Sequence, residues 1–273
     1  MFVHLKQSGE LLRAGGEPVA PGKPSPVWTP NGVRLSTEKL VAAHREREKL
    51  GIDGLLVISG AGNIVRGEDL ENQHIASGMG DFLGRLATIQ NTIVLEKALA
   101  AQRVPVSVFI AETMGLVDAT IDPDYFQPYD VEAVNEAYAR ERIVLIAGGT
   151  GEDGKTTDNA VLEYAKRQQA YKPEGTALIL KGTKYDGVYE RDPARFADER
   201  RFAIISAEQM IENHDQLGTV DISCLEQIRD SELKMRVYAD GQHDLLTVIA
   251  QNGGSSIGTL IVAGQCEAVW ADA

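Results

Sequence analysis

The sequence predicts an α/β protein, a three-layer αβα sandwich with a largely parallel central sheet. Short apolar runs alternate with segments of helical periodicity, which is the order of elements found in parallel α/β sheets. The strand-like runs, such as 54–59 and 143–147, are apolar on both faces, as strands between two helical layers must be. A length of 273 residues is enough for one large domain or two small ones.

The expected elements follow one another along most of the chain. We predict strands at 2–7, 54–59, 104–110, 143–147, 176–181, 235–238 and 257–262, and helices at 35–50, 82–101, 131–139, 157–170, 207–213 and 222–233. The first helix would start at Ser36 or Thr37, which are good N-caps, and stop at Gly51.

Two segments stand out from this alternation. Five prolines between Pro18 and Pro30 exclude a helix there and predict an extended loop. The helix at 82–101 is apolar over much of its circumference, so we expect it to be buried on two sides. The pattern leaves open whether the second side faces the same chain or a partner subunit.

Composition excludes several classes of function. The net charge of −13 argues against a nucleic-acid scaffold or an anionic membrane surface, although a nucleotide needs only a local positive pocket. The two cysteines, Cys224 and Cys266, form no disulfide framework, so a reducing cytoplasm is expected. We expect neither a signal peptide nor a transmembrane helix. The five histidines have no metal-ligand spacing, and no protein metal site is predicted.

A phosphate-loop motif is present but ambiguous. Residues 149–156 fit G-x-x-x-x-G-K-[ST], with Lys155 as the lysine, between a strand-like and a helix-like run. Such a site also needs an apolar strand ending in Asp to help hold magnesium, and we find no convincing one. The P-loop therefore remains a disfavoured alternative.

Four other strand ends carry residues suited to phosphate. They are Lys6 with Ser8 and Gly9; the turn Gly60-Ala61-Gly62-Asn63 with Arg66; Thr156-Thr157-Asp158; and Lys181 with Thr183, Tyr189 and Asp192. Small-residue turns let backbone N–H groups approach a phosphate. Lysines from separate strand ends can converge on one transferring group, because open α/β sheets bind ligands at the carboxyl ends of their strands.

Taken in order, these segments resemble the bacterial uridylate (UMP) kinases of the amino-acid-kinase family. Lys6-x-Ser8-Gly9-Glu10 resembles K-L-S-G-E, and Gly60–Gly67 resembles G-G-G-N-x-x-R-G. Gly80–Asn91 is similar to G-D-x-M-G-M-L-A-T-x-x-N, Thr150–Asp158 to T-G-N-P-F-F-T-T-D, and Lys181–Tyr189 to K-A-T-K-V-D-G-V-Y. The resemblance spans nearly the whole chain and makes the P-loop string at 149–156 a coincidence.

The resemblance implies ATP-dependent phosphorylation of UMP to UDP in pyrimidine nucleotide biosynthesis. It implies one amino-acid-kinase domain over 1–273, with about 1–150 mainly on the acceptor-nucleotide side and about 151–273 mainly on the ATP side. It further implies a cytoplasmic homohexamer that uses Mg²⁺ bound mainly through nucleotide phosphates. The phosphate oxygen of UMP is already anionic, so in-line transfer needs no general base and depends on charge stabilisation.

The resemblance also assigns site residues. The catalytic residues would be Lys6 and Lys181, which stabilise the transferring phosphoryl group, and Asp158, which orients them. ATP would be bound by Lys6, Ser8, Gly9, Gly62, Arg66, Thr183, Tyr189 and Asp192. UMP would be bound by Ala61, Arg66, Asp81, Thr150, Gly151, Glu152, Thr156 and Thr157.

Two departures from the family pattern bear on specificity. Ala61 replaces a glycine, which is tolerable only if its φ is not positive. Glu152 replaces an asparagine expected near the base, and a carboxylate accepts but does not donate hydrogen bonds. Base specificity therefore stays open. The alternatives are a kinase of another acceptor or a non-catalytic nucleotide- or oxyanion-binding protein on the same fold.

Overall fold

The computed structural model describes residues 1–14, 26–65, 77–111, 126–196, 199–251, 254 and 256–271. Its strands are β1 (Phe2–Gln7), β2 (Gly54–Ser59), β3 (Val106–Ile110), β4 (Gln127–Pro128), β5 (Ile143–Ala147), β6 (Ala177–Thr183), β7 (Phe202–Ser206), β8 (Met235–Ala239), β9 (Thr259–Val262) and β10 (Val269–Trp270). Its helices are the 3₁₀ helix η1 (Gly9–Arg13) and α1 (Pro30–Arg45), α2 (Arg47–Leu50), α4 (Ser77–Ala101), α5 (Val131–Ala139), α6 (Thr157–Tyr171), α7 (Ala207–Glu212), α8 (His214–Leu217), α9 (Ile222–Arg229) and α10 (Leu245–Ala250).

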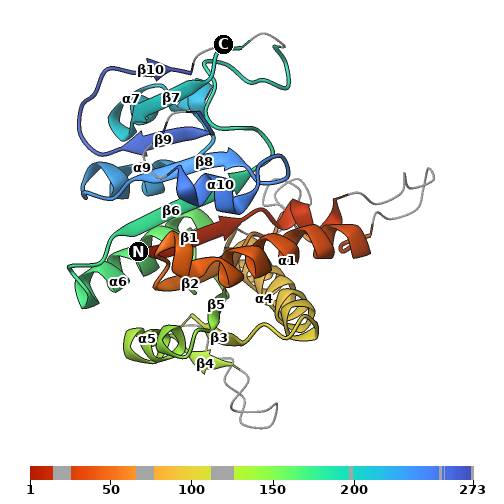
Figure 1. Ribbon diagram of the computed structural model, residues 1–273. Coiled ribbons are helices and arrows are strands. Elements are labelled where there is room, and N and C mark those ends of the chain that lie inside the picture. Colours follow the sequence, from red (N-terminus) through yellow and green to blue (C-terminus); the bar gives the residue numbers. More distant parts are fainter. Residues whose placement is uncertain are drawn as a thin grey trace.

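The described strands form one sheet in the order β10-β7-β9-β8-β6-β1-β2-β5-β3-β4 (Figure 1). The pairs β8–β9 and β10–β7 are antiparallel, and the other neighbouring pairs are parallel. The predicted fold class, with a largely parallel central sheet, is therefore confirmed. β1 lies in the middle of the sheet, between β2 and β6, so its carboxyl end is flanked by two other strand ends.

Helices cover both faces of the sheet and make the outer layers of the sandwich. On one face, α1, α4 and α10 pack Leu40, Leu95 and Leu245 into a single buried core. On the other face, α5, α6 and α9 build a second core. Side chains of a strand alternate between the faces, so in β1 Val3 and Leu5 face the first core and Phe2 faces the second. The alternation places Lys6 on the side of α6.

The first long helix starts earlier than predicted. α1 begins at Pro30, and its N-cap is Thr29, whose hydroxyl oxygen accepts a hydrogen bond from Gly32 N at 2.9 Å. The predicted start at Ser36 or Thr37 is wrong, because both residues are buried within the helix. Proline at the first helical position lacks only an N–H that the helix does not use. The prediction that the segment from Pro18 to Pro30 contains no helix is therefore wrong at Pro30, while residues 15–25 of that stretch lie outside the described residues.

Other differences from the prediction concern short or terminal pieces. α4 starts at Ser77 instead of residue 82, and α9 ends at Arg229 instead of residue 233. β7 and α10 were not predicted, and neither was β10, whose two residues carry no periodicity. In this single chain α4 buries Leu95 and Leu99, whereas Met79 and Phe82 near its start are exposed.

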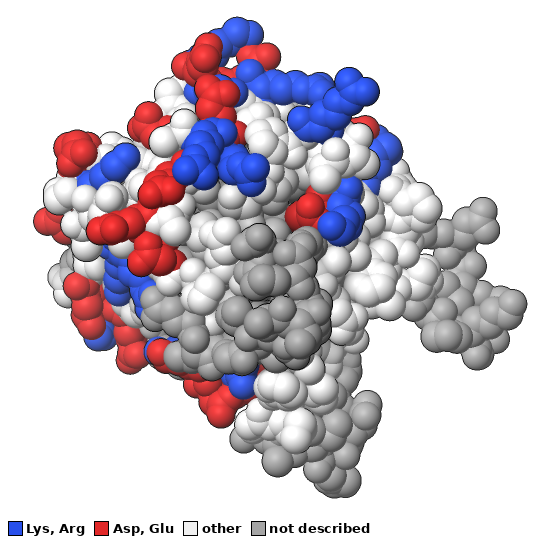
Figure 2. Space-filling view, turned by 90° about the horizontal axis from the view of Figure 1, so that it is seen from below, with Lys and Arg blue, Asp and Glu red and all other residues white. Residues whose placement is uncertain are grey.

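The surface is mixed in charge where the structure describes it. On the face seen in Figure 2, Lys and Arg side chains are interspersed with Asp and Glu, and the non-grey atoms form no continuous basic area. Among the described helices, none combines the length and the apolar character needed to cross a membrane.

Candidate active site

The two predicted catalytic lysines lie side by side at the carboxyl ends of β1 and β6. Lys6 and Lys181 are register partners in the parallel β1–β6 pair, so their side chains leave the sheet on the same face. Both ammonium groups reach one carboxylate. Lys6 Nζ lies 3.7 Å from Asp158 Oδ1, and Lys181 Nζ donates to Asp158 Oδ2. The structure therefore brings the three residues together.

Local sequence places Asp158 at this point. Thr156 is the N-cap of α6, and its hydroxyl oxygen accepts from Asp158 N at 3.2 Å. Asn159 completes the capping box by accepting from Thr156 N at 3.0 Å. Asp158 is thus in the first helical turn, where a negative charge is favoured by the helix dipole. The helix start aims the carboxylate at the lysines on the sheet.

Burial and charge shape the ionisation of this cluster. Burial by itself raises the pKa of the Asp158 carboxyl, but Lys181 and Lys6 outweigh that effect and hold its pKa below the usual value. Burial lowers the pKa of the Lys6 ammonium, which Asp158 raises and Lys181 lowers further. Two ammonium groups contact this one carboxylate, and Asp240 and Asp221 act on Lys6 from further away. Such a cluster can accept an anionic group.

Lys181 is held from a second direction. Its Nζ also donates to Thr219 O at 2.6 Å, in the segment before α9. That segment ends at Asp221, the N-cap of α9, which accepts from the Thr156 hydroxyl at 2.5 Å. Asn159 reaches the same helix by donating to Ser223 Oγ at 3.0 Å. α6 and α9 are therefore tied together around the lysines.

The two small-residue turns predicted at the strand ends pack against each other. A Cβ on Gly9 would lie 2.2 Å from Gly60 O, so no larger residue fits there without movement. Among the described non-glycine residues, positive φ is confined to Arg103 and Glu141. Ala61 is therefore not at positive φ, and its methyl group is compatible with the turn.

An amide network holds the second turn in place. Asn63 donates to Asn91 Oδ1 at 2.9 Å, and Asn91 donates back to Asn63 Oδ1 and to Gly60 O, both at 2.7 Å. Trp28 Nε1 also donates to Asn91 Oδ1, at 2.8 Å. The turn after β2 is thus fixed to α4. Arg66, predicted to contact both nucleotides, lies outside the described residues.

The predicted acceptor loop lies against the start of α4. Gly154 N donates to Asp81 Oδ2 at 2.7 Å, and Arg85 NH1 lies 2.7 Å from Asp153 Oδ1. Thr150 accepts from Glu152 N at 3.2 Å, while Glu152 is exposed. Thr156 is also exposed, and Thr157 is the first residue of α6. The loop and Asp81 are therefore neighbours, as the UMP assignment requires.

The loop turns sharply and needs several glycines. Gly148, Gly149, Gly151 and Gly154 all have positive φ, between 62° and 80°. Lys155, the lysine of the P-loop string, is exposed beside them.

The predicted adenosine contacts lie on the segment after β6. Thr183 donates to Tyr185 O at 2.6 Å, and Tyr189 forms an isolated bridge with Arg201. Asp192 accepts from Ala194 N at 2.9 Å within its own turn. Burial, and then the nearby Asp186, raise the pKa of Tyr189. These contacts order the segment but do not reach the lysine cluster.

Sequence reasoning missed a second buried ion pair next to the phosphate turn. Lys39 of α1 contacts Asp240, which follows β8 and also accepts from Ser8 N at 3.0 Å. No local pattern marks either residue, because a lysine on an amphipathic helix usually has its charge in water.

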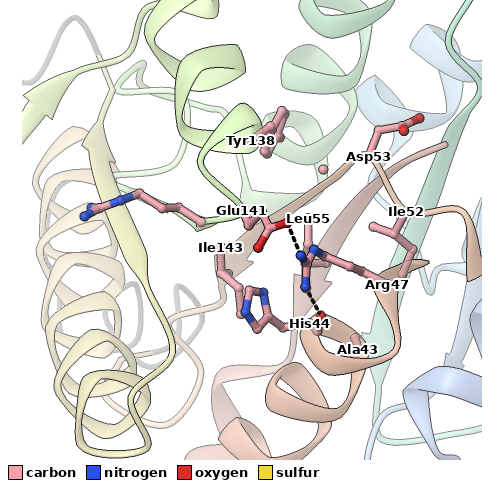
Figure 3. Close-up of a pocket in the computed structure, with 11 residues that line it drawn as sticks. Ala43, His44, Arg47, Ile52, Asp53, Leu55, Tyr138, Glu141 and Ile143 are labelled. Carbon is pink, nitrogen blue, oxygen red and sulfur yellow. Dashed lines mark hydrogen bonds and ion pairs between the residues drawn. The ribbon is translucent and has the colours of Figure 1, made fainter. Parts of the chain in front are cut away.

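A small cavity lies at the amino ends of the strands, opposite the end that carries the lysines. Figure 3 shows Arg47 between Glu141 and His44, near the amino ends of β2 and β5. Arg47 forms an ion pair with Glu141 and donates to His44 O at 3.2 Å. The volume of this cavity, about 30 Å³, leaves no room for a nucleotide.

Protein ligands for a metal are not grouped in the described part of the chain, where no three His, Cys, Asp or Glu side chains come together. Near the lysines, Asp158 is taken up by two ammonium groups and Asp240 by one.

Comparisons with known proteins agree with the motifs. A model of the amino acid kinase family matches residues 7–238. A uridylate kinase of Cereibacter sphaeroides (strain ATCC 17025 / ATH 2.4.3) is 31% identical over 229 residues, which cover 84% of each chain. A uridylate kinase of Nitrobacter winogradskyi is 28% identical over 262 residues, or 96% of this chain and 97% of that one. The crystal structure of UMP kinase from Bacillus anthracis superimposes with a TM-score of 0.76, at 22% identity and 98% coverage of both chains.

These matches confirm the family resemblance that the motifs predict. The match to the family model includes 149–156, so the P-loop alternative has no support.

Proposed function

The chain belongs to the amino acid kinase family, and on that premise we propose that it transfers the γ-phosphoryl group of ATP to UMP, forming UDP. The observation that carries the proposal is the convergence of Lys6 and Lys181 on Asp158 at the carboxyl ends of β1 and β6. The relatives named uridylate kinases support the choice of UMP as acceptor.

The lysines supply charge stabilisation. In phosphoryl transfer, charge spreads over the equatorial oxygens of the moving group, and the two nucleotides repel each other. Lys6 and Lys181 would neutralise that charge from one side of the gap. Asp158 contacts both amines and would keep them oriented between turnovers. No residue needs to remove a proton, because the attacking phosphate oxygen of UMP is already anionic.

Each half of the site would hold one nucleotide. We assign the ATP phosphates to Lys6, Ser8, Gly9, Gly62 and Arg66, and the adenosine to Thr183, Tyr189 and Asp192. UMP would lie among Ala61, Arg66, Asp81 and the loop residues Thr150, Gly151, Glu152, Thr156 and Thr157. By family resemblance about 1–150 would be mainly the acceptor side and about 151–273 mainly the ATP side, with the phosphate-binding residues of each half crossing that division. Asp81 would have to exchange its contact with Gly154 N for one with the ribose.

Magnesium would enter with ATP. Two carboxylates near the phosphate turn and the lysines, Asp158 and Asp240, are already paired with lysines. Mg²⁺ also retains several oxygen ligands from phosphates and water in kinase sites. We therefore propose that the nucleotide phosphates hold the ion, which would neutralise part of their charge when bound.

Assembly and location form part of the proposal. We propose a homo-oligomer, of hexameric order by family resemblance, in the cytoplasm. The exposed apolar side chains Met79 and Phe82 on α4 favour a subunit contact at that helix. Light scattering on the purified chain tests this, and a monomer at micromolar concentration would contradict it.

An acceptor panel tests the activity. Purified protein with Mg²⁺ and ATP is offered UMP, CMP, dUMP, GMP or AMP, and ADP formation is followed by a coupled assay. The proposal predicts that UMP gives the highest kcat/KM. ATP binding without turnover of any acceptor would favour a non-catalytic binding protein, and turnover of a different acceptor would favour another kinase of this fold.

A further inference from the structure

The Asp240 carboxylate joins three parts of the chain, namely the turn after β1, helix α1 and strand β8. Its Oδ2 accepts from Ser8 N at 3.0 Å, in the turn after β1. Its Oδ1 accepts from the Tyr238 hydroxyl at 3.0 Å and from Lys39 Nζ of α1. The Asp240 side chain is 1% exposed, so these contacts replace water completely. Buried carboxylates with several donors are well fixed in position.

A glycine makes room for this carboxylate. A Cβ on Gly182, in β6, would lie 2.5 Å from both Cγ and Oδ2 of Asp240. Asp240 N also donates to Thr183 O at 3.0 Å, which fixes the backbone of the same residue to β6. The carboxyl ends of β1, β6 and β8 thus meet at one side chain.

The charge of this carboxylate is balanced. Lys39 is buried beside it and supplies one positive charge for its one negative charge. An unbalanced carboxylate next to a phosphate-binding turn would repel a polyanion, and the interaction would be strong away from water. The ion pair with Lys39 cancels this repulsion.

The contact acts on the turn through the backbone. Ser8 donates its N–H to Asp240, so this N–H is not available to a phosphate. The hydroxyl of Ser8 and the N–H of Gly9 are further hydrogen-bond donors of the same turn. Gly9 in turn packs directly on Gly60 of the second turn. Fixing Ser8 therefore sets the position of both turns relative to the lysines.

We propose that Asp240 is a positioning residue that orients the Ser8–Gly9 turn for the phosphates of ATP, and that Lys39 neutralises it so that those phosphates are not repelled. This inference rests on the proposed function, which assigns the turn to ATP.

Two double variants, both made in a Tyr238→Phe background so that the Tyr238 hydroxyl loses no partner, isolate the hydrogen bond to Ser8. Lys39→Met with Asp240→Asn removes both charges but keeps a side-chain oxygen that can accept from Ser8 N. Lys39→Met with Asp240→Leu removes both charges and the acceptor, while the side chain stays branched at Cγ. MgATP affinity is measured by titration calorimetry, folding by thermal melting, and KM for UMP in the coupled assay.

The Leu variant should bind MgATP about tenfold more weakly than the Asn variant, because it lacks one buried hydrogen bond. KM for UMP should agree within about twofold between the two. Equal MgATP affinity would overturn the proposal, as would an equal loss for UMP, since a purely structural ion pair would act on both nucleotides alike. If the Leu variant does not fold, Lys39→Met with Asp240→Ser replaces it, because serine is too short to reach Ser8 N.

Binding and turnover separate the two proposals. If the unmutated chain binds MgATP but phosphorylates no UMP, the proposed function fails, and the comparison of affinities still decides the role of Asp240. If the unmutated chain does not bind MgATP at all, the role of Asp240 is refuted as well.

Discussion

Two buried lysine–aspartate clusters lie on opposite faces of the sheet, and they differ in charge balance. On the α6 face, Lys6 and Lys181 share the single carboxylate of Asp158. On the α1 face, Lys39 is matched by Asp240. Both carboxylates are almost fully buried, with 7% and 1% of the side chain exposed. The first cluster therefore has two ammonium groups for one contacting carboxylate, and the second has one for one.

The difference indicates what each cluster is for. An uncompensated buried charge is unfavourable, so a protein retains one where a ligand of opposite charge completes it. The cluster around Asp158 fits an incoming phosphoryl group. The Lys39–Asp240 pair is already complete and can only hold neighbouring groups in place.

Loss of a lysine from the unbalanced cluster should have the largest effect. Lys181→Met removes a cation that we place at the transferring group, so kcat should fall by roughly 10²–10³-fold. Lys39→Met should act mainly on KM for ATP. Steady-state kinetics with both nucleotides varied separate the two outcomes. If both variants change the same parameter equally, the distinction between the clusters is wrong.

A methyl group at Gly182 should disturb the balanced cluster. The new Cβ would overlap the Asp240 carboxylate, and overpacking of this kind costs about 1–3 kcal/mol of unfolding free energy. Urea unfolding of Gly182→Ala measures it. Gly241→Ala is the matched control, since its nearest atom would be Leu11 Cδ1 at 3.6 Å, an ordinary contact. A Gly182→Ala protein as stable as the control would contradict the packing described.

The buried side chain of His4 should make the free energy of unfolding depend on pH. His4 lies two residues before Lys6 in β1, has no ion-pair partner among the described residues, and burial lowers its pKa to about 4. The unfolded chain, with a pKa near 6.5, binds the proton more tightly, so stability falls as pH drops from 6.5 towards 4. Between pH 7 and pH 5 the loss should be about 2 kcal/mol.

Urea unfolding at pH 7 and pH 5 checks this loss, with His4→Leu as the control. The control should lack the His4 contribution to the pH dependence. If both proteins lose the same stability between the two pH values, His4 is not buried in its neutral form.

The smallest effect is expected at the acceptor loop. Arg85→Met breaks the ion pair with Asp153, whose side chain is 67% exposed, so the stability should change by less than about 1 kcal/mol. KM for UMP should rise about two- to fivefold, because the loop loses one anchor on α4. KM for ATP should stay constant. A larger change for ATP than for UMP would place this loop on the wrong side of the site.

The α6-side cluster was predictable from sequence because its members mark element ends. Lys6 and Lys181 lie near the carboxyl ends of parallel strands, and Asp158 lies in the first turn of a helix after a capping threonine. Parallel strands bring their carboxyl ends to the same side of the sheet, so the order of residues along the chain already indicates which side chains meet. The same logic correctly predicted the fold class.

The α1-side cluster was not predictable, because its members are joined only by tertiary packing. Lys39 is in the middle of a helix, and Asp240 lies 201 positions further along the chain. The start of α1 was missed for a related reason. Pro30 is the last proline of an apparent loop and also the first residue of the helix. Edge pieces such as β10 depend on pairing with β7 and have no periodicity of their own.

The most direct test of the account is the rate of UMP phosphorylation by Lys6→Met beside that of Lys49→Met. Lys49 is a matched control, since its side chain is 79% exposed and forms a surface ion pair with nearby Glu46. With saturating MgATP and UMP, the account predicts UDP formation at the unmutated rate for Lys49→Met and a decrease of at least about 10²-fold for Lys6→Met. Equal rates for the two variants would contradict the claim that the paired lysines stabilise the transferring phosphoryl group.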